Sequence, residues 1–137
     1  MMEVIMANFS LKVYYEDTDA EGIVYYANYL KYFERARTEL IYSCGLNHKD
    51  ILSKYEIRIV VKSCNVEFKK PAKFEDNLNV STKIIKISPV RITMEQKILR
   101  KEDVLVDGKI DLVTIDNNGL PKKMPDELYN KFKNSIS

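Results

Sequence analysis

Few of the residues that carry common enzyme chemistry are present. The sequence of 137 residues has one histidine, two cysteines and no tryptophan. His48 lies in a polar stretch, remote from any serine or cysteine motif, so a Ser-His-Asp triad has little support. Cys44 and Cys64 stand apart with no clustered histidine, whereas a zinc site holds four ligands close together. We expect no metal site, no cofactor and free thiols instead of a disulfide.

Glycine and proline are also scarce, with four residues of each, which argues against a long linker or a disordered tail. We therefore expect a single domain that spans residues 1–137. An excess of one charge is lacking too, because 22 basic and 20 acidic residues leave a net charge of +2. Nucleic-acid-binding domains usually carry a clear basic excess, so we expect no nucleic-acid partner.

Long apolar runs are missing as well. No segment approaches the length that a transmembrane helix needs. The first eight residues lack the basic start of a secretory signal, and Glu3 interrupts their short apolar stretch. We therefore expect no stable membrane insertion and, by elimination, a cytoplasmic location.

The clearest element is a helix between Val24 and Cys44, a segment without glycine or proline. Apolar residues recur there at spacings of three and four, with Arg37 as the polar exception, and Gly45 follows as a C-cap. The recurring apolar positions are Ala27, Leu30, Phe33, Leu40, Ile41 and Cys44. So many apolar and aromatic side chains predict a helix that is covered on most sides.

Strand-forming residues dominate the rest of the chain. Phe9–Tyr15 alternates between apolar and polar residues, and four later segments rich in Val, Ile, Thr and Phe are bounded by turn residues. These four are Ile57–Phe68, Asn77–Ile87, Val90–Arg100 and Asp103–Asp116. A short helix is predicted to open at Met124–Leu128. Residues 48–55 fit either a short helix or an ordered connection.

This order predicts an α+β fold. One long apolar helix and one antiparallel sheet bury each other if the sheet wraps around the helix. Such a unit leaves the edges of the sheet unpaired, and unpaired edge strands are a liability for a protein. We therefore expect an oligomer that forms through a sheet edge.

The loop before the long helix offers catalytic chemistry. It carries Asp17 and Asp19, followed by Gly22, directly before a helix N-terminus. The first amides of a helix have no internal partner and carry partial positive charge, so they can hold an oxyanion. A nearby carboxylate can attack a carbonyl or activate water. As an alternative, either acid serves only to cap the helix or to brace the loop.

The stretch from Tyr14 to Glu39 reads YYEDTDAEGIVYYANYLKYFERARTE. It closely resembles the bacterial tol-pal-associated acyl-CoA thioesterases, which belong to the 4-hydroxybenzoyl-CoA thioesterase family of hotdog-fold proteins. The likeness continues more weakly to about Phe132. It implies a hotdog fold, in which an antiparallel β-sheet wraps a long central helix, assembled as a homodimer or homotetramer. It also implies hydrolysis of acyl-CoA or acyl-carrier-protein thioesters.

The resemblance assigns roles to individual residues. It implies that Asp19 is the catalytic carboxylate, as nucleophile or general base, and that the Tyr26 amide donates to the oxyanion. Close bacterial relatives usually have histidine where Tyr26 stands, and the benzoyl-CoA branch has tyrosine there. In that branch a basic cluster grips the nucleotide phosphates at the turn that Lys86 and Arg91 flank here. Substrate contacts are expected from Gly22, Ile23, Val24, Tyr25, Ser63 and Arg91.

Two other functions are compatible with the same fold. A hydratase or dehydratase generally pairs a carboxylate with a histidine, and His48 lies outside any such motif. A non-catalytic hotdog protein that binds acyl-CoA or scaffolds a complex has no need of the Asp19 carboxylate. An acyl-CoA thioesterase is therefore the function that the sequence favours.

Overall fold

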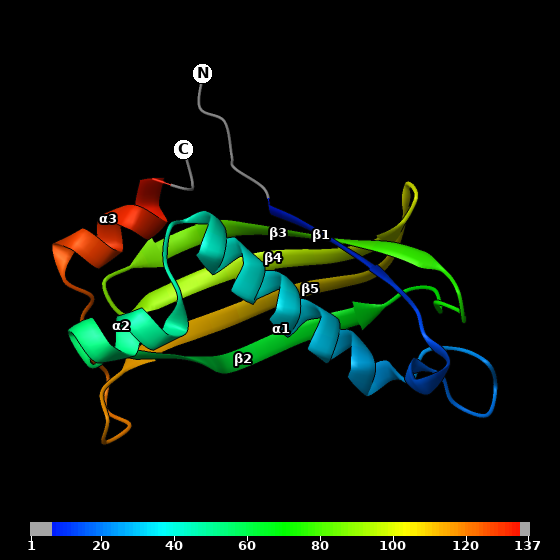
Figure 1. The fold of residues 1–137 in the computed structure, drawn as a ribbon, viewed down its shortest axis with the longest axis horizontal. Coiled ribbons are helices and arrows are strands. Elements are labelled where there is room, and N and C mark those ends of the chain that lie inside the picture. Colours follow the sequence, from blue (N-terminus) through cyan, green and yellow to red (C-terminus); the bar gives the residue numbers. More distant parts are fainter. Residues whose placement is uncertain (1–6, 135–137) are drawn as a thin grey trace.

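Five strands and three α-helices make up most of residues 7–134, the part of the chain that the computed structural model describes. In chain order they are β1 (Ala7–Lys12), the 3-10 turn η1 (Tyr15–Asp17), α1 (Tyr26–Ser43), α2 (His48–Tyr55), β2 (Arg58–Phe68), β3 (Asn77–Ser88), β4 (Arg91–Arg100), β5 (Asp103–Ile115) and α3 (Asp126–Asn134). Helix α1 crosses one face of the sheet, and α2 and α3 lie together at one end (Figure 1). This is the predicted α+β hotdog arrangement.

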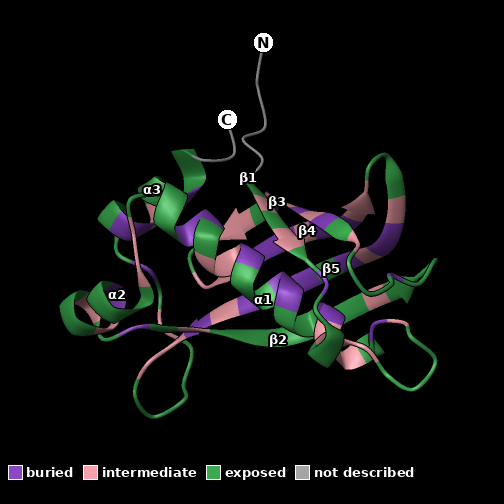
Figure 2. Ribbon diagram, turned by 45° about the vertical axis from the view of Figure 1, so that its right-hand side comes forward, coloured by how far each residue is buried: buried purple, intermediate pink, exposed green. Residues whose placement is uncertain are grey.

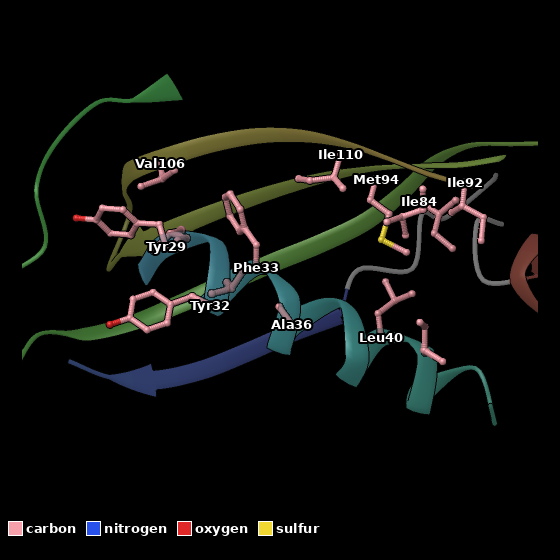
Figure 3. Packing of buried hydrophobic residues seen from close by; sticks show 14 of the residues in the cluster. Tyr29, Tyr32, Phe33, Ala36, Leu40, Ile84, Ile92, Met94, Val106 and Ile110 are labelled. Carbon is pink, nitrogen blue, oxygen red and sulfur yellow. The ribbon is translucent and has the colours of Figure 1, made fainter. Parts of the chain in front are cut away.

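All five strands belong to one antiparallel sheet in the order β1-β3-β4-β5-β2. The pairs β3–β4 and β4–β5 are joined by short turns, which is the usual connection between antiparallel neighbours. Alternate residues of β4 and β5, such as Met94 and its partner Ile110, are buried beneath α1 (Figure 3). Strands β1 and β2 form the two edges of the sheet.

The core lies between α1 and the sheet (Figure 3). The buried face of α1 consists of Tyr29, Tyr32, Phe33, Ala36, Leu40 and Ile41. Phe33 packs so closely over β5 that only glycine fits beneath its ring, at Gly108. Burial of an aromatic or aliphatic side chain of this size stabilises a fold by about 1.5–3 kcal/mol, so this face fixes the position of α1.

The expectation that α1 is covered on most sides is wrong for the single chain. Leu30 is 46% exposed and Tyr42 is 51% exposed. Figure 2 shows exposed residues along the side of α1 that faces away from the sheet. The sheet covers only one face of the helix, so these apolar side chains have no counterpart within one copy.

Arg37, the polar exception in the apolar pattern of α1, takes part in a hydrogen-bond network beneath the helix. Its guanidinium donates to Gln96 Oε1 at 3.0 Å. Gln96 Nε2 in turn donates to the Phe33 carbonyl and to Thr82 Oγ1, each at 2.9 Å. Burial lowers the pKa of Arg37. The network satisfies polar groups that would otherwise destabilise the core.

Two predicted boundaries differ from the structure. The first strand ends at Lys12, before the expected Tyr15, because the Asp17 carboxylate accepts the Tyr14 N–H at 2.9 Å and turns the chain into η1. Helix α1 begins at Tyr26, because Val24 still forms a backbone bridge with Thr18. Residues 48–55 form a helix, α2, which Asn47 caps through the Asp50 amide.

Strand β2 lies at the edge of the sheet, and its residues are exposed along most of its length (Figure 2). An exposed backbone edge of this kind can pair with another strand. Within residues 7–134, no helix is both long enough and apolar enough to cross a membrane.

Candidate active site

The loop between η1 and α1 is held in a fixed shape by its own backbone. Thr18 pairs with Val24, and the Asp19 amide donates to the Ile23 carbonyl at 2.9 Å. Gly22 has a φ of +78°, in the left-handed region that glycine adopts without steric cost. The loop therefore doubles back tightly, with Asp19 near its tip.

Asp17 braces this loop, which is one of the roles that the sequence left open for the two acids, Asp17 and Asp19. Its carboxylate accepts the Tyr14 amide, and its carbonyl accepts the Tyr25 amide at 3.1 Å and Asn28 Nδ2 at 2.8 Å. These bonds tie the start of the loop to the first turn of α1. The Asp17 carboxylate therefore serves to hold the loop in its shape.

The Asp19 carboxylate is oriented within the loop and exposed to solvent. One of its oxygens, Oδ1, accepts the Glu21 amide at 2.8 Å. Its other oxygen makes no hydrogen bond among the residues that the structure describes, and Asp19 does not cap α1, whose N-cap is Tyr25 without a side-chain bond. Asp19 therefore presents a carboxylate oxygen that is available for chemistry.

The N-terminus of α1 begins immediately after this loop. The Asn28 amide bonds to the Tyr25 carbonyl, whereas the amides of Tyr26 and Ala27 have no partner within residues 7–134. Unpaired amides at a helix N-terminus attract negative charge. The Ile23 carbonyl, which accepts the Asp19 amide at 2.9 Å, belongs to a residue three positions before Tyr26, a chain distance of at most about 11 Å.

A mostly apolar cleft of about 290 Å³ lies beside the loop and the start of α1. Its lining residues are Ile23, Val24, Tyr26, Tyr29, Phe68, Lys69, Lys70 and Pro71. The Phe68 ring, at the end of β2, contacts the rings of Tyr29 and Tyr26, with centroid separations of 5.7 and 6.1 Å. The cleft combines apolar walls with two exposed lysines, and Ile23 and Val24 of the Asp19 loop form part of its lining.

Ala72 connects the two sides of this site through its main chain. Its carbonyl accepts the Val24 amide at 2.8 Å, and its amide donates to the Tyr29 hydroxyl at 2.9 Å. Nearby, Arg100 pairs with Asp76 at 2.7 Å. Burial raises the pKa of the Asp76 carboxyl, but the Lys73 amide and the Arg100 guanidinium outweigh it and hold that pKa below its ordinary value.

The predicted contact residues divide into two groups. Gly22, Ile23, Val24, Tyr25 and Tyr26 lie in the Asp19 loop or directly after it. Ser63 and Arg91 lie on the outer face of the sheet, where Ser63 donates to Asp111 at 3.1 Å. Ser63 is five residues from Phe68, about 16 Å along a strand, and Arg91 is at the end of β4 remote from Arg100, about 30 Å away. A single chain does not bring them to the cleft.

Sequence reasoning missed the far wall of the cleft. Lys70 and Pro71 belong to a stretch that the sequence marks only as a turn, and Lys69 carries no signal. Tyr29 is one of six clustered tyrosines, of which the sequence assigns most to core packing and one or two to a pocket wall. The Ala72 amide, which follows Pro71, donates to the Tyr29 hydroxyl and so holds this stretch against α1. No local pattern links that amide to a residue more than forty positions earlier.

Comparison with known proteins agrees with this architecture. The chain matches the family model of the thioesterase-like superfamily over residues 13–132. It is 33% identical to the acyl-CoA thioesterase YbgC of Haemophilus influenzae, over 91% of this chain and 93% of that protein. It is 30% identical to the acyl-CoA thioester hydrolase YbgC of Escherichia coli O157:H7, over 96% and 99% of the two chains.

A solved structure shows the same fold at higher identity. The crystal structure of a probable thioesterase from Bartonella henselae superimposes with a TM-score of 0.84 at 35% sequence identity, and the match covers 88% of this chain and 99% of that one. The family match, the relatives and this structure agree with the arrangement of α1 and the sheet. The chain therefore belongs to the thioesterase-like superfamily of hotdog-fold proteins.

Proposed function

We propose that this protein hydrolyses acyl-CoA thioesters and that Asp19 is its catalytic carboxylate. The observation that carries the proposal is the loop geometry. A carboxylate oxygen without a partner in the described structure lies one short segment from the unpaired amides of Tyr26 and Ala27. The names of the YbgC relatives, acyl-CoA thioesterase and acyl-CoA thioester hydrolase, support the same reaction.

The groups of this site fit the steps of thioester hydrolysis. An oxygen of Asp19, or of a water molecule that Asp19 deprotonates, adds to the acyl carbon. The carbonyl oxygen becomes an oxyanion that faces the amides of Tyr26 and Ala27, and a single donor of this kind contributes about 10²–10³-fold to turnover. The C–S bond then breaks, and its electron pair leaves with the sulfur. Where Asp19 itself has added, water then hydrolyses the mixed anhydride, which releases the acid and restores the carboxylate.

The cleft fits the substrate class in its size and lining. Its apolar walls, including Ile23, Val24 and Phe68, suit the pantetheine arm or the acyl chain near the thioester. Lys69 and Lys70 line the cleft and can attract the phosphates of the nucleotide, although Lys70 also pairs with Asp103 at 3.2 Å. Gly22 and Tyr25 shape the loop beside the thioester carbonyl.

The site is completed by a second copy of the chain in this proposal. The exposed edge strand β2 pairs with β2 of a partner, which forms a homodimer, and two such dimers form a homotetramer. Ser63 and Arg91, which lie far from their own cleft, reach the substrate only in such an assembly. Arg91 then binds the nucleotide phosphates of a substrate held by another copy.

The finer assignments rest on the motif from Tyr14 to Glu39. It supports a place among the tol-pal-associated thioesterases of the 4-hydroxybenzoyl-CoA thioesterase family. A cytoplasmic location is proposed separately from this motif. Acyl carrier protein is proposed as a second donor of thioesters, because it presents the same pantetheine arm as coenzyme A.

The test is thiol release from short, long and aromatic acyl-CoAs by the wild type and by Asp19→Asn. Loss of a general base or nucleophile should lower kcat by about 10²–10⁴-fold. Glu21→Gln is the matched control, since it removes the same charge from an exposed position in the same loop. Full activity in Asp19→Asn would contradict the assignment. Acyl-CoA binding without thiol release by the wild type would favour a non-catalytic binder.

A further inference from the structure

Tyr29 is a buried tyrosine whose hydroxyl proton has no hydrogen-bond acceptor in the part of the chain that the structure describes. Its side chain is 3% exposed and lines the cleft beside the Asp19 loop. The hydroxyl oxygen accepts the Ala72 amide at 2.9 Å, which uses one of its lone pairs. No acceptor for the hydroxyl proton occurs among the residues that the structure describes. A buried donor without an acceptor destabilises a fold, so its presence at a cleft wall points to a ligand.

The surroundings of this hydroxyl favour a donor that keeps its proton. Figure 3 shows Tyr29 at one end of the core cluster, with its hydroxyl directed away from Ile110 and Met94. Burial raises the pKa of Tyr29; the Ala72 bond and Arg100 lower it, whereas the charges of Asp76 and Asp19 raise it. The net shift is upward, so the phenol stays protonated in neutral solution and acts as a hydrogen-bond donor.

Three atoms of a thioester change their charge or bonding during hydrolysis, and two of them already have partners here. The acyl carbon meets the oxygen supplied through Asp19, and the carbonyl oxygen meets the amides of Tyr26 and Ala27. The sulfur, which receives the electron pair of the breaking bond, has no assigned donor. The site has no histidine that could supply one, because His48 lies in α2 at the other end of α1 (Figure 1).

We propose that the Tyr29 hydroxyl donates a hydrogen bond to the sulfur of the departing thiolate. This inference rests on the proposed function. After the C–O bond has formed, the C–S bond of the tetrahedral intermediate breaks, its electron pair moves to sulfur, and Tyr29 stabilises that charge without giving up its proton. The thiolate then leaves and takes a proton from water. Tyr29 is thus a further catalytic residue of the reaction.

Tyr29→Phe alone does not test this role, because it also removes the acceptor of the Ala72 amide. The two effects differ in their dependence on the leaving group. A hydrogen bond to sulfur matters most for an alkyl thiolate, which holds its charge on sulfur, and least for a phenyl thiolate, which delocalises it. A loss of anchoring at Ala72 affects both substrates equally.

The experiment therefore measures kcat/KM for thiol release from two thioesters of one acyl group, an N-acetylcysteamine thioester and an S-phenyl thioester. A hydrogen bond to a charged group corresponds to about 10- to 100-fold in rate, which is the loss expected in Tyr29→Phe with the alkyl substrate. The loss with the phenyl substrate should be several-fold smaller. Tyr129→Phe is the control, because it removes the hydroxyl of a partly buried tyrosine in α3 that does not line the cleft, and it should leave kcat/KM unchanged with both substrates.

Equal losses with both substrates, or no loss with either, overturn the inference and leave the proposed function intact. If the wild type releases no thiol from either thioester or from acyl-CoA, the proposed function fails, and the inference fails with it. Tyr29→3-fluorotyrosine provides a second test that retains the acceptor and the shape of the side chain. As a stronger donor it should speed release from the alkyl thioester and not from the phenyl one; an unchanged rate with both overturns the inference.

Discussion

The packing of Phe33 against Gly108 gives a direct test of how α1 is held on the sheet. Gly108 lies in β5 beneath α1 and has no need of a left-handed conformation. A Cβ atom added there would lie 2.9 and 3.1 Å from two atoms of the Phe33 ring and 3.3 Å from the Ile110 side chain. Gly108→Ala should therefore push the ring, and with it the second turn of α1, away from the sheet.

The expected loss of stability follows from two opposing effects. Extra carbon in a well-packed core typically costs about 1–3 kcal/mol. Replacement of glycine by alanine also restricts the unfolded chain, which returns about 0.4–1 kcal/mol. Gly108→Ala should therefore lower the free energy of unfolding by about 1–2 kcal/mol, a fall in Tm of about 3–8 °C.

Urea unfolding at one fixed protein concentration measures this change, because self-association would otherwise alter the apparent stability. The slope of the transition should stay constant, since the surface exposed on unfolding is nearly the same. The double variant Phe33→Leu/Gly108→Ala should lose less free energy of unfolding than the sum of the two single variants, because leucine lacks the ring atoms that clash with the added Cβ. A Gly108→Ala protein as stable as the wild type, or a purely additive double variant, would refute the packing argument.

Two further predictions concern charged residues around the site. Because the folded-state pKa of Asp76 is depressed, this carboxylate stabilises the fold above about pH 4 and loses that contribution as the pH falls through its folded pKa. Arg100→Gln should raise that pKa, measured by NMR titration of the carboxyl carbon, and should cost about 1 kcal/mol at neutral pH; an unchanged titration would contradict the pairing. Arg91→Gln should raise KM for acyl-CoA but not for the matching acyl-pantetheine, which lacks the nucleotide; equal effects on both would argue against phosphate binding by Arg91.

The elements were predictable where a local pattern had no competitor. The spacing of apolar residues placed α1 within two residues at its start and one at its end, and the turn residues separated β2 from β3, β4 and β5. The end of β1 was not predictable, because Tyr14 and Tyr15 are good strand residues. What ends the strand is a side chain, Asp17, that captures a backbone amide.

Of the candidate site, only the loop that carries Asp19 could be predicted from the sequence, and the position of Ser63 could not. The side of the sheet on which Ser63 lies depends on a bulge between Val61 and Ser63, which shifts the register against β5. Without this extra residue, alternation would place Ser63 on the same face as Val61, towards α1. The bulge moves it to the outer face, beside Asp111. Composition does not reveal a bulge, so a contact between Ser63 and the substrate of its own chain could not be excluded beforehand.

Much of this site is assembled from main-chain groups. The loop closes through the Asp19 amide, the far wall is attached through the amide and carbonyl of Ala72, and the unpaired donors are the amides of Tyr26 and Ala27. A backbone amide remains a donor whichever side chain its residue carries, proline excepted. Under the proposed function, the side chains that line the cleft can therefore change, and with them the acyl groups that fit, while this main-chain frame stays in place.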